Sequence, residues 1–336
     1  MYQKKMYPSM TLEVNHKIKK ALPIGGAFFC FLLCLACGDL TNQKQEIRGY
    51  AQGTTYNISF YGNASKSELQ SGIDSMLLRM DHALSNYKAS SQIFQLNQST
   101  DTIYTLEDSC GFWKRVWLVS KEVHQKSKGA FDPSIYPLVK TYGFGPNQKP
   151  SIDSTANIDS LKALVGFENW SASWKDGKSF TLQKPLGAQL DFNAVAQGMA
   201  VDLISEFLES NNIKSYFVEL GGEVRVGEPK PGNLPWVLGI ETPNNTTERT
   251  LSDTLQIKNI SVATSGSNRK YYEQDGKRYS HAINAKTAAP VSHNVLSVTI
   301  KHKSCAYADA WATAALVLGE ESKVLLEEES IGFIFQ

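Results

Sequence analysis

Asp309 and Thr313 are two oxygen-bearing residues whose spacing suits a hard metal ion. They stand four residues apart in an alanine-rich segment, so a helix there places both side chains on one face. A carboxylate, a hydroxyl and nearby backbone carbonyls are oxygen ligands that suit Mg²⁺ better than Zn²⁺. The alternative is that Asp309 only stabilises the N-terminus of the helix electrostatically.

Three other segments combine glycine with polar residues at the ends of expected strands or helices. In residues 190–198, Asp191 or Asn193 can cap the following helix, and the free N–H groups of a helix start can also bind an anion. Residues 263–267 are small hydroxyl residues and glycine at the end of an expected strand, which suits either a phosphate cradle or a plain turn. Residues 129–134 suit a helix C-cap followed by a turn, with ligand binding as the alternative.

His281 is the histidine nearest in sequence to the 263–267 segment. A neutral imidazole beside a phosphate-binding turn could accept the proton of a hydroxyl group. The competing interpretation is a packed or surface histidine without a chemical role. The sequence contains no phosphate-loop, dinucleotide-turn, His-Glu-x-x-His or nucleophile-elbow motif, so it does not indicate the common nucleotide, zinc-protease or serine-hydrolase sites.

Apolar periodicity predicts the elements that must position these residues. Helices are expected where apolar residues recur at helical spacing, and strands where short apolar runs are bounded by turns. Helices come early and strands cluster late, which favours an α+β fold over an alternating parallel sheet. The expected helices are residues 66–84, 113–123, a segment from 193 and 306–318, and the expected strands are 56–61, 215–226, 236–241, 255–263 and 295–301.

The N-terminus has the pattern of an export signal. Three lysines precede the apolar run of residues 21–36, which is short for a membrane span of about 20 residues. The Leu-Ala-Cys of residues 35–37 resembles a bacterial lipobox, in which Cys37 is lipidated and becomes the mature N-terminus. We therefore expect a lipoprotein signal peptide over residues 1–36, a polar tether over 37–48 and one domain over 49–336. An uncleaved anchor helix is the alternative.

Composition and charge exclude several classes of protein. The 336-residue chain has 34 Lys and Arg against 33 Asp and Glu, and 10% of its residues are aromatic. Neither a disordered chain nor a dedicated nucleic-acid binder has this composition. Without residues 1–36, 29 basic residues face 32 acidic ones, which gives a net charge of −3. Five cysteines are too few for a disulfide scaffold of this length.

In their order along the chain, these segments resemble the FAD:protein FMN transferases, the ApbE-like flavin transferases. The resemblance extends from about Gly49 onward. The matching segments are residues 53–56 (Gly-Thr-Thr-Tyr), 80–81 (Met-Asp), 85–87 (Ser-Asn-Tyr), 129–133 (Gly-Ala-Phe-Asp-Pro), 191–202, 221–222 (Gly-Gly), 264–266 (Thr-Ser-Gly) and 308–313 (Ala-Asp-Ala-Trp-Ala-Thr).

The resemblance implies a single α+β domain, related to the T-fold, with mixed or antiparallel sheets and flanking helices. It implies a Mg²⁺-dependent enzyme that cleaves the pyrophosphate of FAD, passes FMN to a Thr or Ser of an acceptor protein and releases AMP. The implied metal ligands are Asp309, Thr313 and the backbone carbonyl of Ala194, and the implied catalytic base is His281. The implied FAD-binding residues are Gln52, Tyr87, Ala130, Phe131, Asp132, Asp191, Gln197, Thr264, Ser265, Gly266 and Ile283.

The resemblance further implies a lipid-anchored protein of the bacterial cell envelope that faces the periplasm, with a membrane redox-complex subunit as the acceptor. Two other functions stay open: a Mg²⁺-dependent FAD pyrophosphatase that frees FMN and AMP, and a non-catalytic FAD-binding lipoprotein. Three positions depart from the family pattern. Gln197 stands where many members have Lys, and Asn284 and Ala288 stand where they have Asp and Gly. At Asn284 and Ala288 the loop geometry and a metal contact are open questions, at Gln197 a phosphate-facing charge is missing, and weakened activity stays an open alternative.

Overall fold

The computed structural model describes residues 43–146, 157–243, 250–267, 271–274 and 277–336. The chain divides into the units Met1–Leu40 and Thr41–Gln336, and all elements below belong to the second unit. The expected signal peptide and Cys37 lie outside the described residues. Within the described ranges, no helix combines the length and the apolar character that crossing a bilayer requires.

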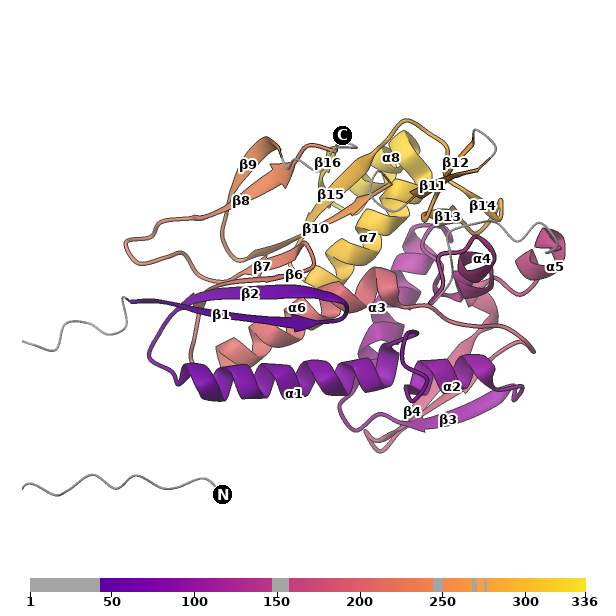
Figure 1. Cartoon of the computed structure of the whole chain (residues 1–336), viewed down its shortest axis with the longest axis horizontal. Helices are drawn as coiled ribbons and strands as arrows, with labels where there is room; N and C mark the ends of the chain where they lie inside the picture. The colour runs from indigo at the N-terminus through magenta and orange to yellow at the C-terminus, as the bar shows by residue number, and fades with distance from the viewer. Residues whose placement is uncertain (1–42, 147–156, 244–249, 268–270, 275–276) are drawn as a thin grey trace, which may run out of the picture. The chain divides into compact units, whose positions relative to one another are not determined.

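The largest sheet has seven strands in the order β1-β2-β6-β7-β10-β15-β16, so strands far apart in sequence become neighbours (Figure 1). Every neighbouring pair is antiparallel, and together with the helices this confirms the predicted α+β class. The strands are β1 (Lys44–Ala51), β2 (Thr54–Tyr61), β6 (Ser215–Leu220), β7 (Glu223–Val226), β10 (Ile260–Gly266), β15 (Ser297–His302) and β16 (Gly332–Phe335).

Smaller antiparallel sheets accompany it. One has three strands in the order β3-β5-β4, and three others are two-stranded ribbons. Their strands are β3 (Ile103–Glu107), β4 (Ser171–Lys175), β5 (Ser179–Gln183), β8 (Trp236–Glu241), β9 (Leu251–Ile257), β11 (Tyr271–Gln274), β12 (Lys277–Ser280), β13 (Ile283–Asn284) and β14 (Ala289–Pro290).

Helices α6 (Asn193–Ser210) and α7 (Cys305–Leu318) pack against each other and against the seven-stranded sheet. Helix α6 contacts β6 and β7, whereas α7 contacts β10 and β15 (Figure 1). The other helices are α1 (Lys66–Leu84), α2 (Gln92–Gln98), α3 (Phe112–Lys126), α4 (Tyr136–Thr141), α5 (Ile158–Lys162) and α8 (Ser322–Glu328), with short 3₁₀ turns η2 (Pro133–Ile135), η3 (Phe167–Asn169) and η4 (Gly319–Glu321).

Helix α1 shows how local sequence specifies these elements. The hydroxyl of Ser65 accepts the N–H of Glu68 and caps the first turn. Leu69 and Ile73 begin a stripe of buried apolar residues that continues at helical spacing to Leu84. The structure therefore confirms the predicted bounds of this helix.

Two predicted strands are each divided in the structure. Residues 215–226 form a hairpin, because Gly221 and Gly222 adopt φ values of 67° and 115° and turn the chain between β6 and β7. Residues 255–263 belong to β9 and β10, which lie in different sheets. In both cases the apolar pattern continues across the turn and conceals it.

The predicted tether was too long at its C-terminal end. Residues 44–48 form the first part of β1, and Ile47 is fully buried opposite Ile58 of β2. The segment looked like a linker because its other residues are polar, and the Glu46 carboxylate pairs with both Lys44 and Arg48.

Candidate functional site

The first turn of α6 departs from regular helix geometry at Ala194, a predicted metal ligand. Its backbone angles are φ −84° and ψ 19°, and this ψ rotates its carbonyl away from the direction it has in a regular helix. Four residues later, the N–H of Gly198 donates a 3.0 Å hydrogen bond to Oδ2 of Asp309 on α7. A regular helix would direct that N–H at the Ala194 carbonyl. The distortion thus joins the start of α6 to the predicted ligand on α7.

Asp309 is a buried carboxylate with little to balance its charge. Its side chain is 6% exposed, and the Gly198 N–H is its hydrogen-bond donor in the described part of the chain. Burial raises the pKa of Asp309 to about 7, and the Gly198 bond opposes that rise. Buried carboxylates are usually paired or bind a metal, so this one favours a cation site.

Thr313 lies one helical turn after Asp309, and its Oγ1 is 3.1 Å from Oγ of Ser265 on β10. The structure thereby brings together residues predicted from three separate segments. The Asp309 carboxylate and the Thr313 hydroxyl are oxygen donors of the kind that Mg²⁺ binds, as is the Ala194 carbonyl at the distorted start of α6. A divalent cation would also neutralise the buried charge, so the residues present fit this ion.

Thr264, Ser265 and Gly266 do not form the open turn that we expected, because they are the last residues of β10 and pair with β15. Oγ1 of Thr264 lies 2.8 Å from Oγ1 of its cross-strand neighbour Thr299. A plain turn and a loop-type phosphate cradle are therefore both wrong as descriptions of this backbone. The role of these residues in FAD binding stays a prediction.

Gln197 and Gln52 carry carboxamides on two elements near this region. Gln197 lies so close to the β6–β7 turn that a Cβ on Gly221 would be 2.8 Å from its Nε2. Gln52 occupies the β1–β2 turn with a φ of 51°, and its Nε2 donates to Sδ of Met80. Its buried Oε1 has no hydrogen-bond partner among the described residues. Since an unpaired buried acceptor is costly, a ligand N–H there would be favourable.

Asn97 and Asn86 hold the backbone just before the predicted FAD residue Asp191. Asn97 Oδ1 accepts the N–H of Leu190, and its Nδ2 donates to the carbonyl of the same residue. Asn86 donates a longer bond of 3.3 Å to that carbonyl. The N–H of Asp191 donates to the Pro133 carbonyl, which ties this segment to the 129–134 region. Sequence reasoning missed Asn97 because its partner lies 93 residues away.

Tyr87, Tyr136 and Asp191 form an electrostatic group. Tyr87 is 63% exposed, and partial burial and the Asp191 charge raise the pKa of its phenol. Burial, Asp191 and Tyr87 together raise the pKa of Tyr136 to about 12. Tyr136 was not among the predicted site residues, because in sequence it is one more aromatic residue of an apolar helix.

Ala130, Phe131 and Asp132 are buried or nearly so, and the Asp132 side chain is directed into the protein. Its Oδ1 accepts both the N–H and the hydroxyl of Ser134. Its Oδ2 accepts the N–H of Phe167 and lies 3.8 Å from Nδ1 of His124. Nδ1 of His124 also lies 2.9 Å from the backbone carbonyl oxygen of Phe131. These contacts assign Asp132 a structural role, and its role in FAD binding stays a prediction.

The other end of the His124 ring faces Glu168, with Nε2 3.3 Å from Oε2. Ligand-type atoms of His124, Asp132 and Glu168 all lie within 4.8 Å of one another. Because Nδ1 contacts a carbonyl, which only accepts hydrogen bonds, it must carry a proton. The Glu168 side chain is 66% exposed. This arrangement is that of a histidine held between two carboxylates, and it shares no residue with the Asp309 region.

His281, the predicted base, lies between β12 and β13. Its ring packs edge-on against Phe144, with ring centroids 6.2 Å apart. Ile283 is buried two residues later in β13, which contacts α7. The structure thus places the His281 segment beside the helix that carries Asp309.

Asn284 and Ala288, which depart from the family pattern, lie in the turn that follows His281. Oδ1 of Asn284 accepts the N–H groups of Lys286 and Thr287, as an aspartate carboxylate would. Ala288 has a φ of 54°, in the left-handed region that favours glycine, and Tyr142 donates a hydrogen bond to its carbonyl. The turn therefore forms with Asn284 and Ala288 in place, and the effect of these two residues on activity stays a prediction.

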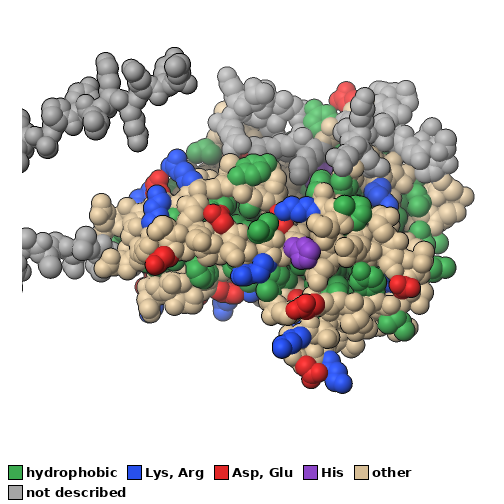
Figure 2. Space-filling view, turned by 60° about the horizontal axis from the view of Figure 1, so that its bottom comes forward, with side chains coloured by type: hydrophobic (Ala, Val, Ile, Leu, Met, Phe, Trp, Pro, Cys, Tyr) green, Lys and Arg blue, Asp and Glu red, His purple; other side chains and the backbone are tan. Residues whose placement is uncertain are grey.

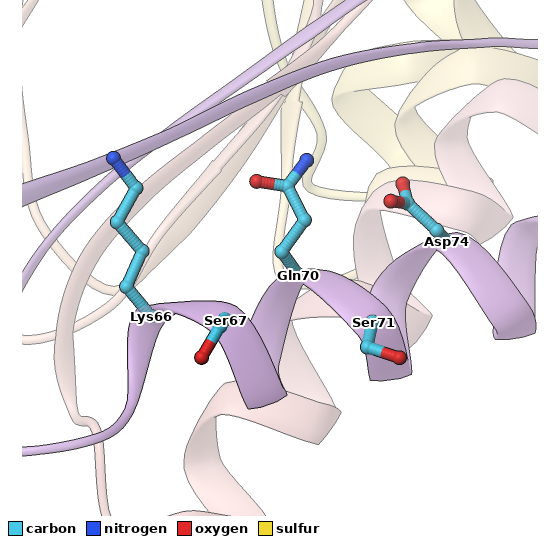
Figure 3. Close-up of a pocket in the computed structure, with 5 residues that line it drawn as sticks. All are labelled: Lys66, Ser67, Gln70, Ser71 and Asp74. Carbon is cyan, nitrogen blue, oxygen red and sulfur yellow. The ribbon is translucent and has the colours of Figure 1, made fainter. Parts of the chain in front are cut away.

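A groove of about 750 Å³ lies along the first half of α1, away from the predicted site residues. Lys66, Gln70 and Asp74 point toward the strands beside the helix, as Figure 3 shows. Gln70 donates to the Arg48 carbonyl and the Tyr56 hydroxyl, and that hydroxyl donates to Asp74. These contacts indicate that the polar groups fasten α1 to β1 and β2.

The described surface in Figure 2 mixes basic and acidic side chains, and neither sign forms a continuous patch on that face. This distribution agrees with the nearly balanced charge of the sequence. An extended basic surface is the usual mark of a nucleic-acid partner, and the described part of this face does not offer one.

Comparisons with known proteins point to one family. The model of the ApbE family matches residues 52–335. The FAD:protein FMN transferase of Vibrio cholerae is 32% identical over 303 residues, which cover 88% of each chain. The protein of the same name from Escherichia coli (strain K12) is 32% identical over 85% of this chain and 82% of its own.

Solved structures are similar as well. The flavin transferase ApbE from Vibrio cholerae superposes with a TM-score of 0.76 at 29% identity, covering 87% of this chain and 93% of that chain. The apo form of the Pseudomonas stutzeri flavinyl transferase ApbE has a TM-score of 0.77 at 29% identity, with 87% and 90% covered.

Proposed function

Because the chain belongs to the ApbE family and is a transferase, we propose that it moves FMN from FAD to the hydroxyl of a Thr or Ser in an acceptor protein, with Mg²⁺ bound at Asp309. The observation that carries the proposal is that elements from separate parts of the chain, α6 and α7, meet at the Asp309 carboxylate. Asp309 is buried, has no ion pair with a cationic side chain among the described residues, and meets the distorted start of α6 one helical turn from Thr313. A hard cation there would stand where a phosphate-bearing substrate needs its charge balanced.

The reaction forms one phosphorus–oxygen bond and breaks another. The acceptor hydroxyl oxygen attacks the phosphorus of the FMN half, and the bond from that phosphorus to the AMP phosphate breaks. AMP leaves and takes up the proton that the hydroxyl releases. His281 is the residue that we assign to accept that proton first, a role that contributes about 10²–10⁴-fold in rate.

The remaining residues bind and orient. Asp309, Thr313 and the Ala194 carbonyl would hold Mg²⁺, which when bound neutralises the negative charge that gathers on the phosphoryl oxygens. Asn97 fixes Leu190, so Asp191 and the start of α6 keep their position. The unpaired Oε1 of Gln52 is available to a donor of the bound FAD.

The test combines the purified chain with FAD, MgCl₂ and an exported flavoprotein acceptor that carries its target Thr. In-gel flavin fluorescence reports covalent FMN, and chromatography reports AMP. A Mg²⁺-dependent fluorescent acceptor band, absent with a Thr→Val acceptor, is the expected result. AMP and free FMN without a band would instead establish an FAD pyrophosphatase. Bound, intact FAD without either product would establish a flavin-binding protein and overturn the proposal.

His281→Ala provides the matching test of the base, with His82→Ala on α1 as the control. We expect the first variant to lose turnover while it still binds FAD, and the second to behave like the wild type. Equal turnover in both variants would remove His281 from the mechanism.

We also propose that Cys37 is lipidated and anchors the protein to the membrane on the periplasmic side, where a redox-complex subunit is the acceptor. The support is the lysine-led apolar run and the Leu-Ala-Cys sequence before residue 38. Mass spectrometry of the membrane fraction should find a lipid-modified N-terminal Cys37. In the Cys37→Ala variant this species should disappear, and detection of an unmodified Cys37 in the mature wild type would contradict the proposal.

A further inference from the structure

Asp202 on α6 is a fully buried carboxylate that receives the N-terminus of α7. Its Oδ2 accepts the Ser304 hydroxyl at 2.6 Å and the Ala306 N–H at 3.0 Å. Its Oδ1 accepts the Cys305 N–H at 2.9 Å. The free N–H groups of a helix start are normally capped by a neighbouring residue of the same chain segment. Here a carboxylate more than 100 residues earlier in the sequence does so, in addition to the local Ser304 cap.

Two arginines balance the charge of Asp202. Nη1 of Arg225 donates to Oδ1 at 2.7 Å, and Nη2 of Arg115 lies 3.8 Å from Oδ2. Arg115 also makes a two-pronged ion pair with Glu206, one turn further along α6. The carboxylate is therefore a paired and hydrogen-bonded buried charge with a fixed orientation.

The Asp202 cap and the Asp309 contact are two hydrogen-bonded contacts, one turn apart, between the antiparallel helices α6 and α7. On α6, Gly198 precedes Asp202 by four residues, and on α7, Cys305 precedes Asp309 by four residues. Asp202 contacts the Cys305 end, and Gly198 contacts Asp309. Between these two contacts the helices are so close that a Cβ on Gly198 would lie 2.4 Å from the Cys305 carbonyl oxygen. The Asp202 contact therefore helps to fix the position of α7, and with it that of Asp309, relative to α6.

We propose that Asp202 is a positioning residue: through the N-terminus of α7 it sets where Asp309 and Thr313 stand relative to the Ala194 carbonyl, and thereby sets the affinity for Mg²⁺. This inference rests on the metal site of the proposed function. It assigns Asp202 no contact with FAD, so loss of the cap should weaken Mg²⁺ binding and leave the FAD interaction nearly unchanged. Residues that orient metal ligands typically change metal affinity by about 10-fold to 100-fold when they are replaced.

The test compares Asp202→Asn with Glu206→Gln in the full chain, since both change a carboxylate into an amide on α6 and only the first contacts α7. Calorimetric titration with MgCl₂ gives the affinity directly, and turnover gives the half-saturating Mg²⁺ and, at saturating Mg²⁺, the KM for FAD. We expect Asp202→Asn to raise both Mg²⁺ constants about 10-fold or more while the KM for FAD stays within about twofold. Glu206→Gln should match the wild type.

Ser304→Ala keeps the inference testable if Asp202→Asn fails to fold, because it removes one donor to the carboxylate, together with the local cap of the Tyr307 N–H, and leaves the bonds from the Cys305 and Ala306 N–H groups in place. It should raise the Mg²⁺ constant by a smaller factor in the same direction. If the wild type binds Mg²⁺ and both variants bind it with the same affinity as the wild type, the positioning role of Asp202 is overturned and the proposed metal site stands. A wild type that binds no Mg²⁺ at all would overturn the proposed metal site and this inference with it.

Discussion

The carboxamide of Asn97 and the backbone of Leu190 form a two-way hydrogen-bonded pair, with bonds of 2.7 Å to the Leu190 N–H and 2.8 Å to its carbonyl. Because Asn97 belongs to α2, this pair ties a short helix to the extended segment that leads into α6. Leu190 is itself fully buried, so neither backbone group has water as a substitute partner.

Asn97→Ala should therefore destabilise the protein and displace Asp191. The variant removes the bond of the buried Leu190 N–H, which costs about 1–3 kcal/mol, and leaves the Leu190 carbonyl with only the longer bond from Asn86. We expect a lower Tm by calorimetry and a higher KM for FAD, with a smaller change in half-saturating Mg²⁺. Asn86→Ala is the comparison variant: it removes the longer bond to the same carbonyl and the 3.0 Å bond that Oδ1 of Asn86 accepts from Nδ2 of Asn97, and it leaves both bonds between Asn97 and Leu190 in place. Equal effects of the two variants would show that the two-way pair has no special importance.

Asp309→Asn should stabilise the metal-free protein at about pH 8. Burial raises the pKa of Asp309 to about 7 from a usual value near 4, so the folded state holds a proton that the unfolded state has lost between these values. Stability from this group is therefore present at low pH and is lost as pH rises through 7, on the order of a few kcal/mol.

Thermal unfolding in EDTA at several pH values measures this effect. The Tm advantage of Asp309→Asn should be largest at about pH 8 and should shrink toward pH 5, and added MgCl₂ should raise the Tm of the wild type only. Glu206→Gln, on an exposed carboxylate, should show no such trend. A variant less stable than the wild type at high pH would mean that Asp309 has a partner which balances its charge.

Gly198→Ala should force α6 and α7 apart. The new Cβ would lie 2.4 Å from the Cys305 carbonyl oxygen and 2.8 Å from Cβ of Asp309, and backbone atoms cannot rotate out of the way. Overpacking of this kind costs about 1–3 kcal/mol. We expect a lower Tm in denaturation experiments and weaker Mg²⁺ binding by titration. Ser210→Ala, at the exposed end of the same helix, should change neither quantity.

Thr313→Val should weaken Mg²⁺ binding, because it replaces a proposed ligand hydroxyl by a methyl group of nearly the same volume. Ser265→Ala should weaken it less, since Ser265 orients the Thr313 hydroxyl across 3.1 Å. Loss of such an orienting contact costs about 10-fold in metal affinity. Mg²⁺ titration of both variants measures the order, and a larger effect of Ser265→Ala would exchange the two roles.

Local sequence signals were sufficient for the elements that carry the site. Apolar spacing defined α1, and a spacing of four residues predicted that Asp309 and Thr313 share one face of α7. The same kind of signal failed where the chain turns without losing its apolar pattern, as at Gly221. It also failed at β1, where polar residues on an edge strand resemble a linker.

The contacts that hold the site together were beyond sequence reasoning, because they join residues far apart along the chain. Asn97 meets Leu190, and Asp202 meets the start of α7, yet each residue taken alone looks like an ordinary polar helix position. Ala288 is a different case. Its backbone is left-handed although it is not glycine, and the Tyr142 hydroxyl donates to its carbonyl, so the residue type alone did not reveal the conformation.

The early start of β1 at Lys44 limits the reach of the enzyme. If Cys37 is the lipidated residue, only six residues separate it from the sheet, and a fully extended chain spans at most about 3.3–3.6 Å per residue. The first residue of β1 would then stay within roughly 25 Å of the lipid headgroups, about three-fifths of the distance that a twelve-residue tether allows. An acceptor hydroxyl must then come to the membrane surface to be modified, so the anchor itself would select among exported proteins by how near the bilayer their target segments lie.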